Sequence, residues 1–411
     1  MKPRAAARCG AGLLLSLIAH ASPAAHYDPG ASDSEIRIGN IASYSGAAQS
    51  YAAVARAEAA YFHMINDRGG INGRRIAFIS VDDGSDASQA PALAQRLIEQ
   101  DRVLALFSTF GTDANLAIRG YANEHRIPQL FVESSSAAFD DPAHFPWTMG
   151  FYATYRTEGL AYAHYLLEHN PAARVAVLYE HSSAGQEFHD GLRDGLGEHA
   201  ATMLVSEATY ASGEAGAEAG IDAQLEALKR TGADTFMNLS FGPTASAAIR
   251  RAYDIGWHPL QFIPNASLSV AAFLDPAGLE KAAGIISSAR SKSWWHPHAD
   301  RDPEVREFLD WMARYNPGVS ARDQLNVAGY ERAEALVAVL RQCGDELTRA
   351  NLMAQAASLD TPIGMLRPGI RLKTARDDYQ PIKELFLIRF DGREWTGLDA
   401  TASASPAGSR R

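Results

Sequence analysis

The sequence predicts an α/β protein with two Rossmann-like, doubly wound lobes. Short β-rich runs alternate with helical runs along most of the 411 residues, and this alternation is typical of parallel sheets with helices on both faces. About a dozen elements precede residue 265, which is too many for one compact sheet with short loops. We therefore expect two similar halves, with the break between 146 and 152.

Predicted strands and helices alternate in both halves. The predicted strands of the first half are 36–41, 75–81, 104–108 and 129–132, and its helices are 52–65, 88–100 and 115–124. The predicted helices of the second half are 154–168, 185–196, 221–230 and 244–254, and its strands are 174–179, 202–209 and 235–239. Because helices separate the strands within each half, we expect the strands to run parallel.

The first residues carry the features of an export signal. Lys2, Arg4 and Arg8 form a basic start, the apolar run 11–19 follows, and Ala19-His20-Ala21 offers a cleavage site of the small-x-small type. This order predicts a secretory signal peptide over residues 1–21. The apolar run falls well short of the roughly 20 residues that span a bilayer, so we expect an exported protein. The composition of the tail at 400–411 predicts disorder.

Composition and missing motifs argue against several function classes. The formal net charge of -10 argues against nucleic acid as a partner, because nucleic-acid binders carry basic patches. The chain contains no G-x-G-x-x-G after a predicted strand, no phosphate-loop motif and no H-E-x-x-H, so we expect no cofactor and no metal. Cys343 is the only cysteine beyond the predicted signal peptide, which excludes a disulfide within one mature chain.

Two motifs leave an enzymatic function as a less favoured alternative. His181-Ser182-Ser183-Ala184-Gly185 resembles a nucleophile elbow that lacks its first glycine, so a hydrolase is conceivable. The run 294–300 contains two histidines and an aspartate, but Pro297 between the histidines favours an irregular surface loop over a metal site. We therefore expect a protein that is not an enzyme.

Small polar residues gather where predicted strands end and helices begin. Five such clusters occur, at 43–46, 108–112, 133–136, 182–185 and 240–244. In open α/β sheets, ligands bind at the carboxyl ends of the strands, and helix N-termini there favour an anion or a carboxylate. Ser, Thr and Gly are also common turn and cap residues, but five clusters over both halves favour a shared cleft between the lobes.

A series of short motifs runs through both halves. They are Ser45-Gly46, Ala57-Glu58-Ala59-Ala60, Ile65-Asn66, Gly69-Gly70-Ile71-Asn72-Gly73, Asp82-Asp83, Gly111-Thr112, Ile127-Pro128, Pro146-Trp147-Thr148-Met149-Gly150, Ala176-Val177-Leu178-Tyr179 and Ala252-Tyr253-Asp254-Ile255-Gly256-Trp257. Over residues 35 to 395, the sequence resembles the branched-chain amino-acid-type periplasmic binding proteins of ABC transporters. The resemblance implies a type I periplasmic binding fold whose chain crosses between lobes three times. The implied N-lobe is 33–152 plus 287–380, and the implied C-lobe is 153–286 plus 381–399.

The pocket residues of this family can be matched to the sequence one at a time. Thr112 and Ser135 match the hydroxyl residues, after the third and fourth strands, that hold the ligand carboxylate. Tyr51, Phe241 and Tyr330 match aromatic positions that line the pocket. The neighbouring polar residues that complete the candidate ligand-binding set are Ser45, Gly111 and Ser134.

Three positions depart from the family pattern. Ala184 stands where an aromatic residue is usual, and Asn265 or Ala266 lies near where amino-acid binders place an acid for the ligand ammonium. An ammonium buried without that acid is costly, so the sequence favours an aromatic or branched acid as ligand. Glu133, where the family usually has a small residue, is a candidate replacement for the missing acid, so amino acids and amides stay open.

The resemblance implies the solute-binding component of an ABC importer, located in the periplasm. Such a protein captures a small carboxylate-bearing ligand in the cleft and delivers it to a permease in the inner membrane. We expect a monomer. A sensor of the same fold that signals to a partner is the alternative, because function depends on the site and its partners rather than on the fold.

Overall fold

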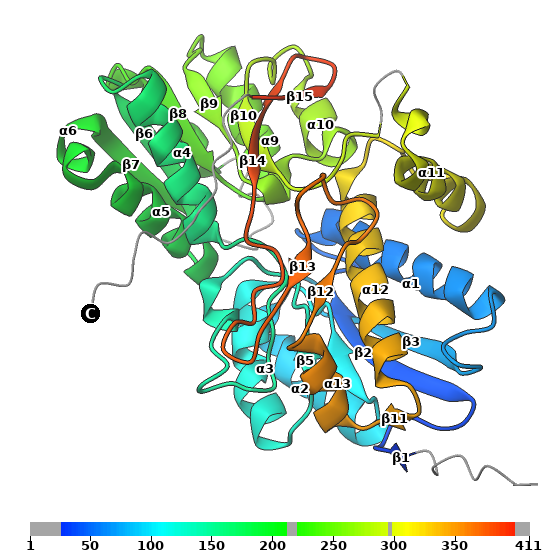
Figure 1. Cartoon of the computed structure of the whole chain (residues 1–411). Coiled ribbons are helices and arrows are strands. Elements are labelled where there is room, and N and C mark those ends of the chain that lie inside the picture. The colour runs from blue at the N-terminus through cyan, green and yellow to red at the C-terminus, as the bar shows by residue number, and fades with distance from the viewer. Residues whose placement is uncertain (1–25, 212–219, 295–297, 399–411) are drawn as a thin grey trace, which may run out of the picture.

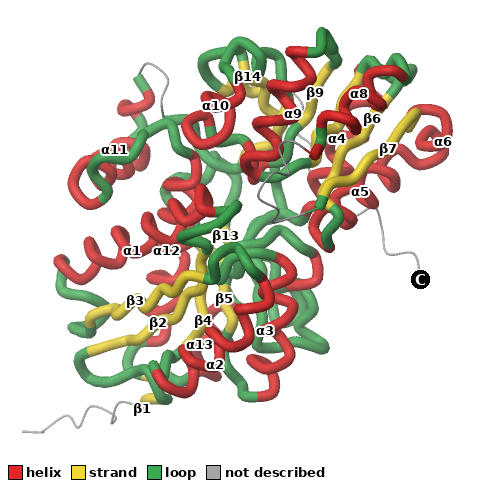
Figure 2. Tube along the Cα trace, turned by 180° about the vertical axis from the view of Figure 1, so that it is seen from behind, coloured by secondary structure: helices red, strands yellow, loops and turns green. Residues whose placement is uncertain are grey.

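The computed structural model describes residues 26–211, 220–294 and 298–398, which form two lobes (Figure 1). Figure 2 shows the same two bodies from behind, with helices packed around the strands of each. The predicted signal peptide at 1–21 and the predicted disordered tail at 400–411 lie outside the described residues. Within the described ranges, no helix combines the length and apolar character needed to cross a membrane.

The first lobe is built on a four-stranded parallel sheet in the order β3-β2-β4-β5. Its strands are β2 (Glu35–Ala42), β3 (Arg75–Asp82), β4 (Ala105–Phe107) and β5 (Gln129–Leu130). The helices of this lobe are α1 (Ala52–Asp67), α2 (Ala90–Gln95), α3 (Thr112–Glu124), α11 (Pro303–Tyr315), α12 (Gln324–Cys343) and α13 (Arg349–Ala356). In Figure 1 this lobe is the lower body, where blue and cyan segments meet gold and orange ones.

The second lobe contains a seven-stranded sheet in the order β15-β14-β10-β9-β8-β6-β7. Its strands are β6 (Val175–Glu180), β7 (Leu204–Tyr210), β8 (Thr235–Leu239), β9 (Leu260–Phe262), β10 (Ile286–Ala289), β14 (Phe386–Phe390) and β15 (Trp395–Gly397). Its helices are α4 (Tyr155–His169), α5 (Ser183–Leu196), α6 (Ala200–Met203), α8 (Asp222–Arg230), α9 (Gly242–Asp254) and α10 (Asp275–Ala277). The strands run parallel from β7 to β10, and β14 and β15 add an antiparallel edge.

Two further sheets contain two strands each. One pairs β1 (His26–Tyr27) with β11 (Glu346–Leu347), and the other pairs β12 (Asp360–Thr361) with β13 (Leu372–Lys373). The pairing of β1 with β11 joins the start of the described chain to the helices of its last third. Both ends of the described chain therefore take part in regular structure.

The chain passes between the lobes three times. It leaves the first lobe before α4, returns after β10 and crosses again before β14. The predicted fold class, two doubly wound lobes joined by a hinge with three crossings, is confirmed. The strand β10 stays in the larger sheet through Ala289, so the chain returns to the first lobe a few residues later than the boundary at 287 that the resemblance implied.

Helix α12 packs along α1 and carries two buried ionisable side chains. Gly329 permits the close approach of the two helices, because a Cβ there would lie 2.4 Å from the Val54 carbonyl oxygen and 2.7 Å from the Ala57 Cβ. Two and three residues further along the helix, Glu331 and Arg332 are fully buried. Arg332 lies on the side of α12 that packs against α1, because it pairs with Glu58 of that helix.

Two predicted elements differ locally from the structure. The predicted helix 88–100 is α-helical only over α2 and ends in a π-helical turn at Arg96–Gln100. The predicted strand 202–209 starts later, at Leu204, because the short helix α6 extends through Met203. Both differences concern element ends, where local sequence signals are weakest.

Candidate ligand-binding cleft

A cavity of about 970 Å³ lies between the two lobes, at the carboxyl ends of their strands. Thr112 and Ser134 line it from the first lobe, and Ala184 and Phe241 line it from the second. Arg290, from the segment that follows β10, also lines the cavity. The volume lies at the upper end of the range typical of small-molecule sites, roughly 300–1,000 Å³.

Most of the predicted pocket residues meet at this cavity. The predicted residues in its lining are Tyr51, Gly111, Thr112, Glu133, Ser134, Ser135, Ala184, Phe241 and Asn265. They meet because parallel strands present all their carboxyl ends at one edge of a sheet. The two lobes place these edges face to face.

Ser45 lies at the exposed rim instead of in the cavity lining. Its hydroxyl donates to Asp82 Oδ2 at 2.6 Å. Asp82 Oδ1 also accepts from the backbone N–H groups of Tyr44 and Gly84, at 2.8 and 2.9 Å. These bonds fix the turn after β2 against the end of β3, so Ser45 has a structural role.

Tyr330 also lies outside the cavity lining, although it was predicted to line the pocket. Only 4% of the residue is exposed, and its ring packs edge-on against Tyr61 and Phe308 at centroid distances of 4.8 and 5.3 Å. Ala328 faces the cavity from the same helix. Two steps along an α-helix rotate a side chain by about 200°, so Tyr330 points into the core of the first lobe.

Hydroxyl groups from two neighbouring loops meet on the first-lobe side of the cavity. Thr112 Oγ1 and Ser134 Oγ share a hydrogen bond of 2.8 Å, and Ser135 lines the cavity next to them. Thr112 begins α3, and Gly111 before it has a φ of 89°, which glycine adopts without strain. The first N–H groups of a helix lack partners within it, so this corner suits an anionic oxygen.

Aromatic rings form the walls of the cavity. The Tyr51 ring stacks on Phe110 at a centroid distance of 5.2 Å, and its hydroxyl donates across the cleft to the Ala266 carbonyl oxygen at 3.2 Å. Phe241 packs against Tyr155 at 5.5 Å. These rings offer apolar surface to the body of a ligand.

Asn265 is held by three hydrogen bonds at the second-lobe side. Its backbone N–H donates to Glu158 Oε1 at 2.7 Å, and its Nδ2 donates to the Ser288 carbonyl oxygen at 2.6 Å. Its Oδ1 accepts from Arg290 Nη1 at 2.8 Å. A guanidinium therefore stands beside the position where the resemblance places an acid in amino-acid binders.

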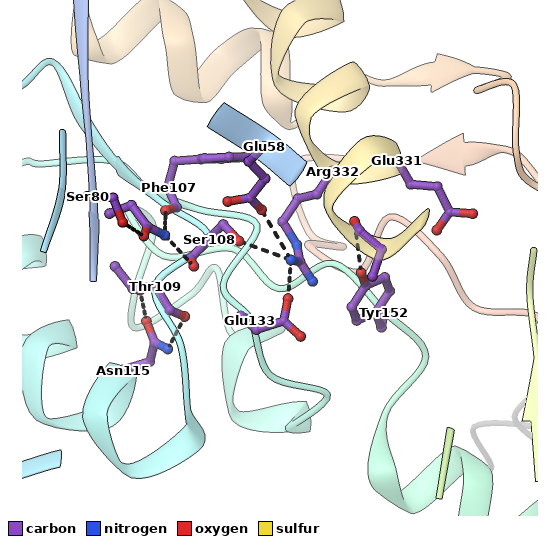
Figure 3. A network of polar contacts seen from close by, with 12 residues as sticks. Glu58, Ser80, Phe107, Ser108, Thr109, Asn115, Glu133, Tyr152, Glu331 and Arg332 are labelled. Carbon is purple, nitrogen blue, oxygen red and sulfur yellow. Dashed lines mark hydrogen bonds and ion pairs between the residues drawn. The ribbon is translucent and has the colours of Figure 1, made fainter. Parts of the chain in front are cut away.

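Glu133 forms an ion pair with Arg332, whose side chain is fully buried (Figure 3). Arg332 Nη1 also lies 3.4 Å from Glu58 Oε1 and donates to Ser108 Oγ at 3.0 Å. Burial raises the pKa of Glu58 to about 8, although the charge of Arg332 opposes the shift. Because Glu133 is engaged with Arg332, the geometry argues against its serving as the partner of a ligand ammonium.

Arg290 and its partners are the cavity residues that the sequence pattern missed. The Arg290 guanidinium carbon lies 3.6 Å from the Tyr152 ring centroid, and Nε donates to Glu331 Oε2 at 3.2 Å. Arg332 lies 4.7 Å from the same ring centroid, so two cations contact one aromatic ring. The sequence signal was an arginine directly after a strand, but the last predicted strand is 235–239, and β10 was not predicted.

The elbow-like motif spans the start of α5. Ser183 is exposed and does not line the cavity. Ser182 caps α5, because its Oγ accepts from the Gly185 N–H at 3.2 Å. No group of three potential metal ligands occurs among the described residues, and 295–297 of the predicted loop lie outside them.

Comparison with known proteins identifies the family of this chain. A family profile described as periplasmic binding protein matches residues 35–394. The chain belongs to the periplasmic binding protein family. An amino acid binding protein of Pseudomonas aeruginosa is 24% identical over 198 residues, which cover 47% of this chain and 50% of that protein. The chain thus spans about half the length of this protein and of a Leu/Ile/Val-binding protein homolog of Brucella abortus.

Solved structures show the same fold over nearly the whole binding protein. A possible leucine/isoleucine/valine-binding protein from Rhodopirellula baltica superposes with a TM-score of 0.77 at 18% identity, covering 89% of this chain and 96% of that one. A solute binding protein of an ABC transporter from R. palustris, in complex with benzoate, gives 0.73 at 19% identity and covers 91% and 98%. The predicted resemblance is confirmed.

Proposed function

We propose that this chain is the extracytoplasmic solute-binding component of an ABC importer, and that it captures a small carboxylate-bearing ligand in the interlobe cavity. The observation that carries the proposal is the hydroxyl pair of Thr112 and Ser134 at the start of α3. Hydrogen bonds to a charged acceptor are shorter and stronger than neutral ones. This corner therefore offers hydroxyl and backbone donors together to one carboxylate.

The rest of the cavity favours an aromatic or branched acid over an α-amino acid. Tyr51 and Phe241 supply apolar walls, and Ala184 leaves room where the family usually has an aromatic side chain. A ligand ammonium would need an unpaired acid, but Glu133 is paired with Arg332. The benzoate complex of the R. palustris protein supports an aromatic acid as one candidate class.

Family membership and the predicted signal peptide support a periplasmic location. A permease in the inner membrane is then the expected partner, since the matched R. palustris protein is described as part of an ABC transporter. Uptake of the ligand should be lost when the gene is deleted and regained when it is restored. Unchanged uptake would favour the sensor of the same fold instead.

The ligand class is tested by mass spectrometry of small molecules released from the purified protein. We expect an organic acid that rebinds in calorimetry and that protects the protein against thermal unfolding. The variant Thr112→Val removes the hydroxyl, keeps the shape and should weaken rebinding. Release of a neutral or cationic molecule that rebinds equally well to Thr112→Val would contradict the proposed carboxylate site.

A further inference from the structure

We propose that Arg290 forms a second anion-binding position in the cavity, so that the preferred ligand is a diacid. One carboxylate binds at Thr112 and Ser134, and the second acidic group pairs with the Arg290 guanidinium. The inference rests on the proposed function of the cavity and specifies its ligand class further. It assigns a binding role to a residue outside the set predicted from the sequence.

The guanidinium of Arg290 has hydrogen-bonding capacity left over. Within the protein, its Nε donates to Glu331 Oε2 and its Nη1 donates to Asn265 Oδ1. Its Nη2 has no protein partner among the described residues, and the side chain lines the cavity while only 11% exposed. A nearly buried cationic donor is stabilised by an anionic acceptor, and the cavity is where a ligand can supply one.

The position of the guanidinium is fixed from several sides. Its carbon lies 3.6 Å from the ring centroid of Tyr152, which belongs to the first crossing between the lobes. Glu331, which accepts from Arg290, also accepts from Ser291 Oγ at 2.6 Å. Asn265 holds the other edge from the second lobe. A side chain fixed in this way loses little conformational entropy when it binds a ligand.

The charges around Arg290 leave room for a second anion. Glu331 and Glu133 are paired with Arg290 and Arg332 respectively. Burial raises the pKa of the Glu158 carboxyl above its ordinary value, which favours its uncharged form. Among the described residues, the carboxyl groups that contact Arg290 or its partner Asn265 are thus Glu331, which is paired, and Glu158, whose charge is disfavoured by burial.

The same geometry disfavours a zwitterionic amino acid. An ammonium that bonded to Asn265 Oδ1 would sit beside Arg290 Nη1, which already donates to that oxygen at 2.8 Å, and two cations at this distance repel. Glu158 is the other acid close to Asn265, but its Oε1 already accepts from Tyr162 Oη and Ser288 Oγ, at 2.6 and 2.7 Å. Asn265 N–H adds a third donor to that oxygen.

The test compares diacids with their monomethyl esters by calorimetry. Straight-chain and aromatic dicarboxylates are titrated beside their monomethyl esters, which keep the size and remove one charge, and beside leucine. One additional charge-assisted contact predicts that at least one diacid binds about ten- to a hundredfold more tightly than its ester. Equal affinity of every diacid and its ester, or no binding by any diacid, would overturn the inference.

Paired variants assign the preference to Arg290. Arg290→Gln combined with Glu331→Gln removes both charges of the pair, so that neither is left buried alone, and should bind diacid and ester equally. The exposed pair Arg371 and Asp360 supplies the matched control, Arg371→Gln with Asp360→Asn, which should keep the wild-type preference. If the first double variant fails to fold in circular dichroism, Arg290→Lys is used, and it should reduce the preference.

Two results separate this inference from the function on which it rests. Thr112→Val should weaken the binding of diacid and ester by the same factor, because both retain the carboxylate held there. A preference for the diacid that survives the change at Arg290 would overturn the inference and leave the carboxylate site intact. Leucine binding tighter than any diacid, and lost in Glu158→Gln, would also overturn it and identify Glu158 as the ammonium acceptor.

Discussion

Arg332 carries a buried positive charge directly beneath the cleft. Glu133 and Glu58 approach the same guanidinium nitrogen, Nη1, and the side chain has no exposed surface (Figure 3). Removing one partner of a buried ion pair leaves an uncompensated charge and typically costs about 3–5 kcal/mol. Arg332 therefore holds the loop of Glu133 in place, and through it the neighbouring serines of the cavity.

The variant Arg332→Met should lower the free energy of unfolding by about 3–5 kcal/mol in urea denaturation at neutral pH. Adding Glu133→Gln should recover part of this loss, because it removes the carboxylate left without a partner. A double variant as unstable as Arg332→Met alone would show that packing, not charge, explains the loss.

Glu58 predicts a pH dependence of stability. Burial raises the pKa of its carboxyl from 4.5 to about 8, so the folded protein holds this proton more tightly than the unfolded chain. The contribution of Glu58 to the free energy of unfolding therefore decreases as the pH rises from about 4.5 to about 8. Glu58→Gln should make the decrease shallower in denaturation curves measured across this window. An identical slope in both proteins would contradict the assignment.

Removing the hydroxyl group of Thr112 or of Ser135 should reduce the affinity for the acid without reducing the stability of the protein. A hydrogen bond to a charged group contributes roughly 1.5–3 kcal/mol, so Thr112→Val or Ser135→Ala should weaken acid binding about ten- to a hundredfold. Thr202→Val, at an exposed hydroxyl of α6, is the control and should bind normally. Calorimetry beside thermal melting separates the outcomes, since a lower melting temperature with unchanged affinity would indicate a cap role only.

At the residue scale, the sequence could predict that the hydroxyl groups of Thr112 and Ser134 line the cavity. It could not predict the buried ion pairs of Arg290 and Arg332. Thr112 and Ser134 follow strands that periodicity makes visible, and parallel strands bring their ends together. Arg290 and Arg332 acquire their roles through partners far away in the chain, such as Glu58, which is 274 positions from Arg332. Tyr330 was misplaced because a helix turns by about 100° per residue, so neighbouring residues face different partners.

At the element scale, caps explain why several helices begin where the sequence predicted. Thr154 Oγ1 accepts from the Thr157 N–H at 3.0 Å at the start of α4, and Ser182 does the same for α5. Such caps contribute about 1 kcal/mol each. Ser182 and Ser134 both line the cavity. Only the structure shows that the Ser182 hydroxyl caps α5, whereas the Ser134 hydroxyl bonds Thr112.

The contact between α1 and α12 predicts an effect of a single methyl group. Gly329→Ala would place a Cβ 2.4 Å from the Val54 carbonyl oxygen, so the helices must move apart, at a cost of about 1–3 kcal/mol. Gly120→Ala on α3 meets no atom within 4 Å and should be neutral or stabilise by up to about 1 kcal/mol. Thermal melting of both variants tests this, and equal melting temperatures would contradict the close packing.

At the scale of the whole molecule, periodicity predicted two halves but not the exchange of segments between them. The strand β10 pairs with β14, and the pairing joins residues about a hundred positions apart, such as Ile286 and Arg389. Local sequence patterns carry no information on this pairing, because it depends on which strand of the sheet still has an unpaired edge. The three crossings were implied by the family resemblance alone.

Hydrogen bonds already join the two lobes. Tyr51 Oη donates to the Ala266 carbonyl oxygen at 3.2 Å, and the Ala137 N–H donates to Glu187 Oε1 at 2.8 Å. Ring packing of Tyr51 on Phe273, at a centroid distance of 5.4 Å, adds an apolar contact between the lobes, and three chain segments form the hinge. Two rigid lobes connected in this way are expected to rotate about the hinge, and a ligand that bonds to both lobes favours the closed arrangement.

Small-angle scattering with and without a saturating acid tests this clamp most directly. The account predicts that the radius of gyration decreases when the acid binds, because the ligand holds Thr112 of the first lobe and the cavity wall of the second lobe together. The measurement is made at a concentration at which calorimetry shows full occupancy. An unchanged radius at full occupancy would contradict the central claim that the two lobes close around the ligand.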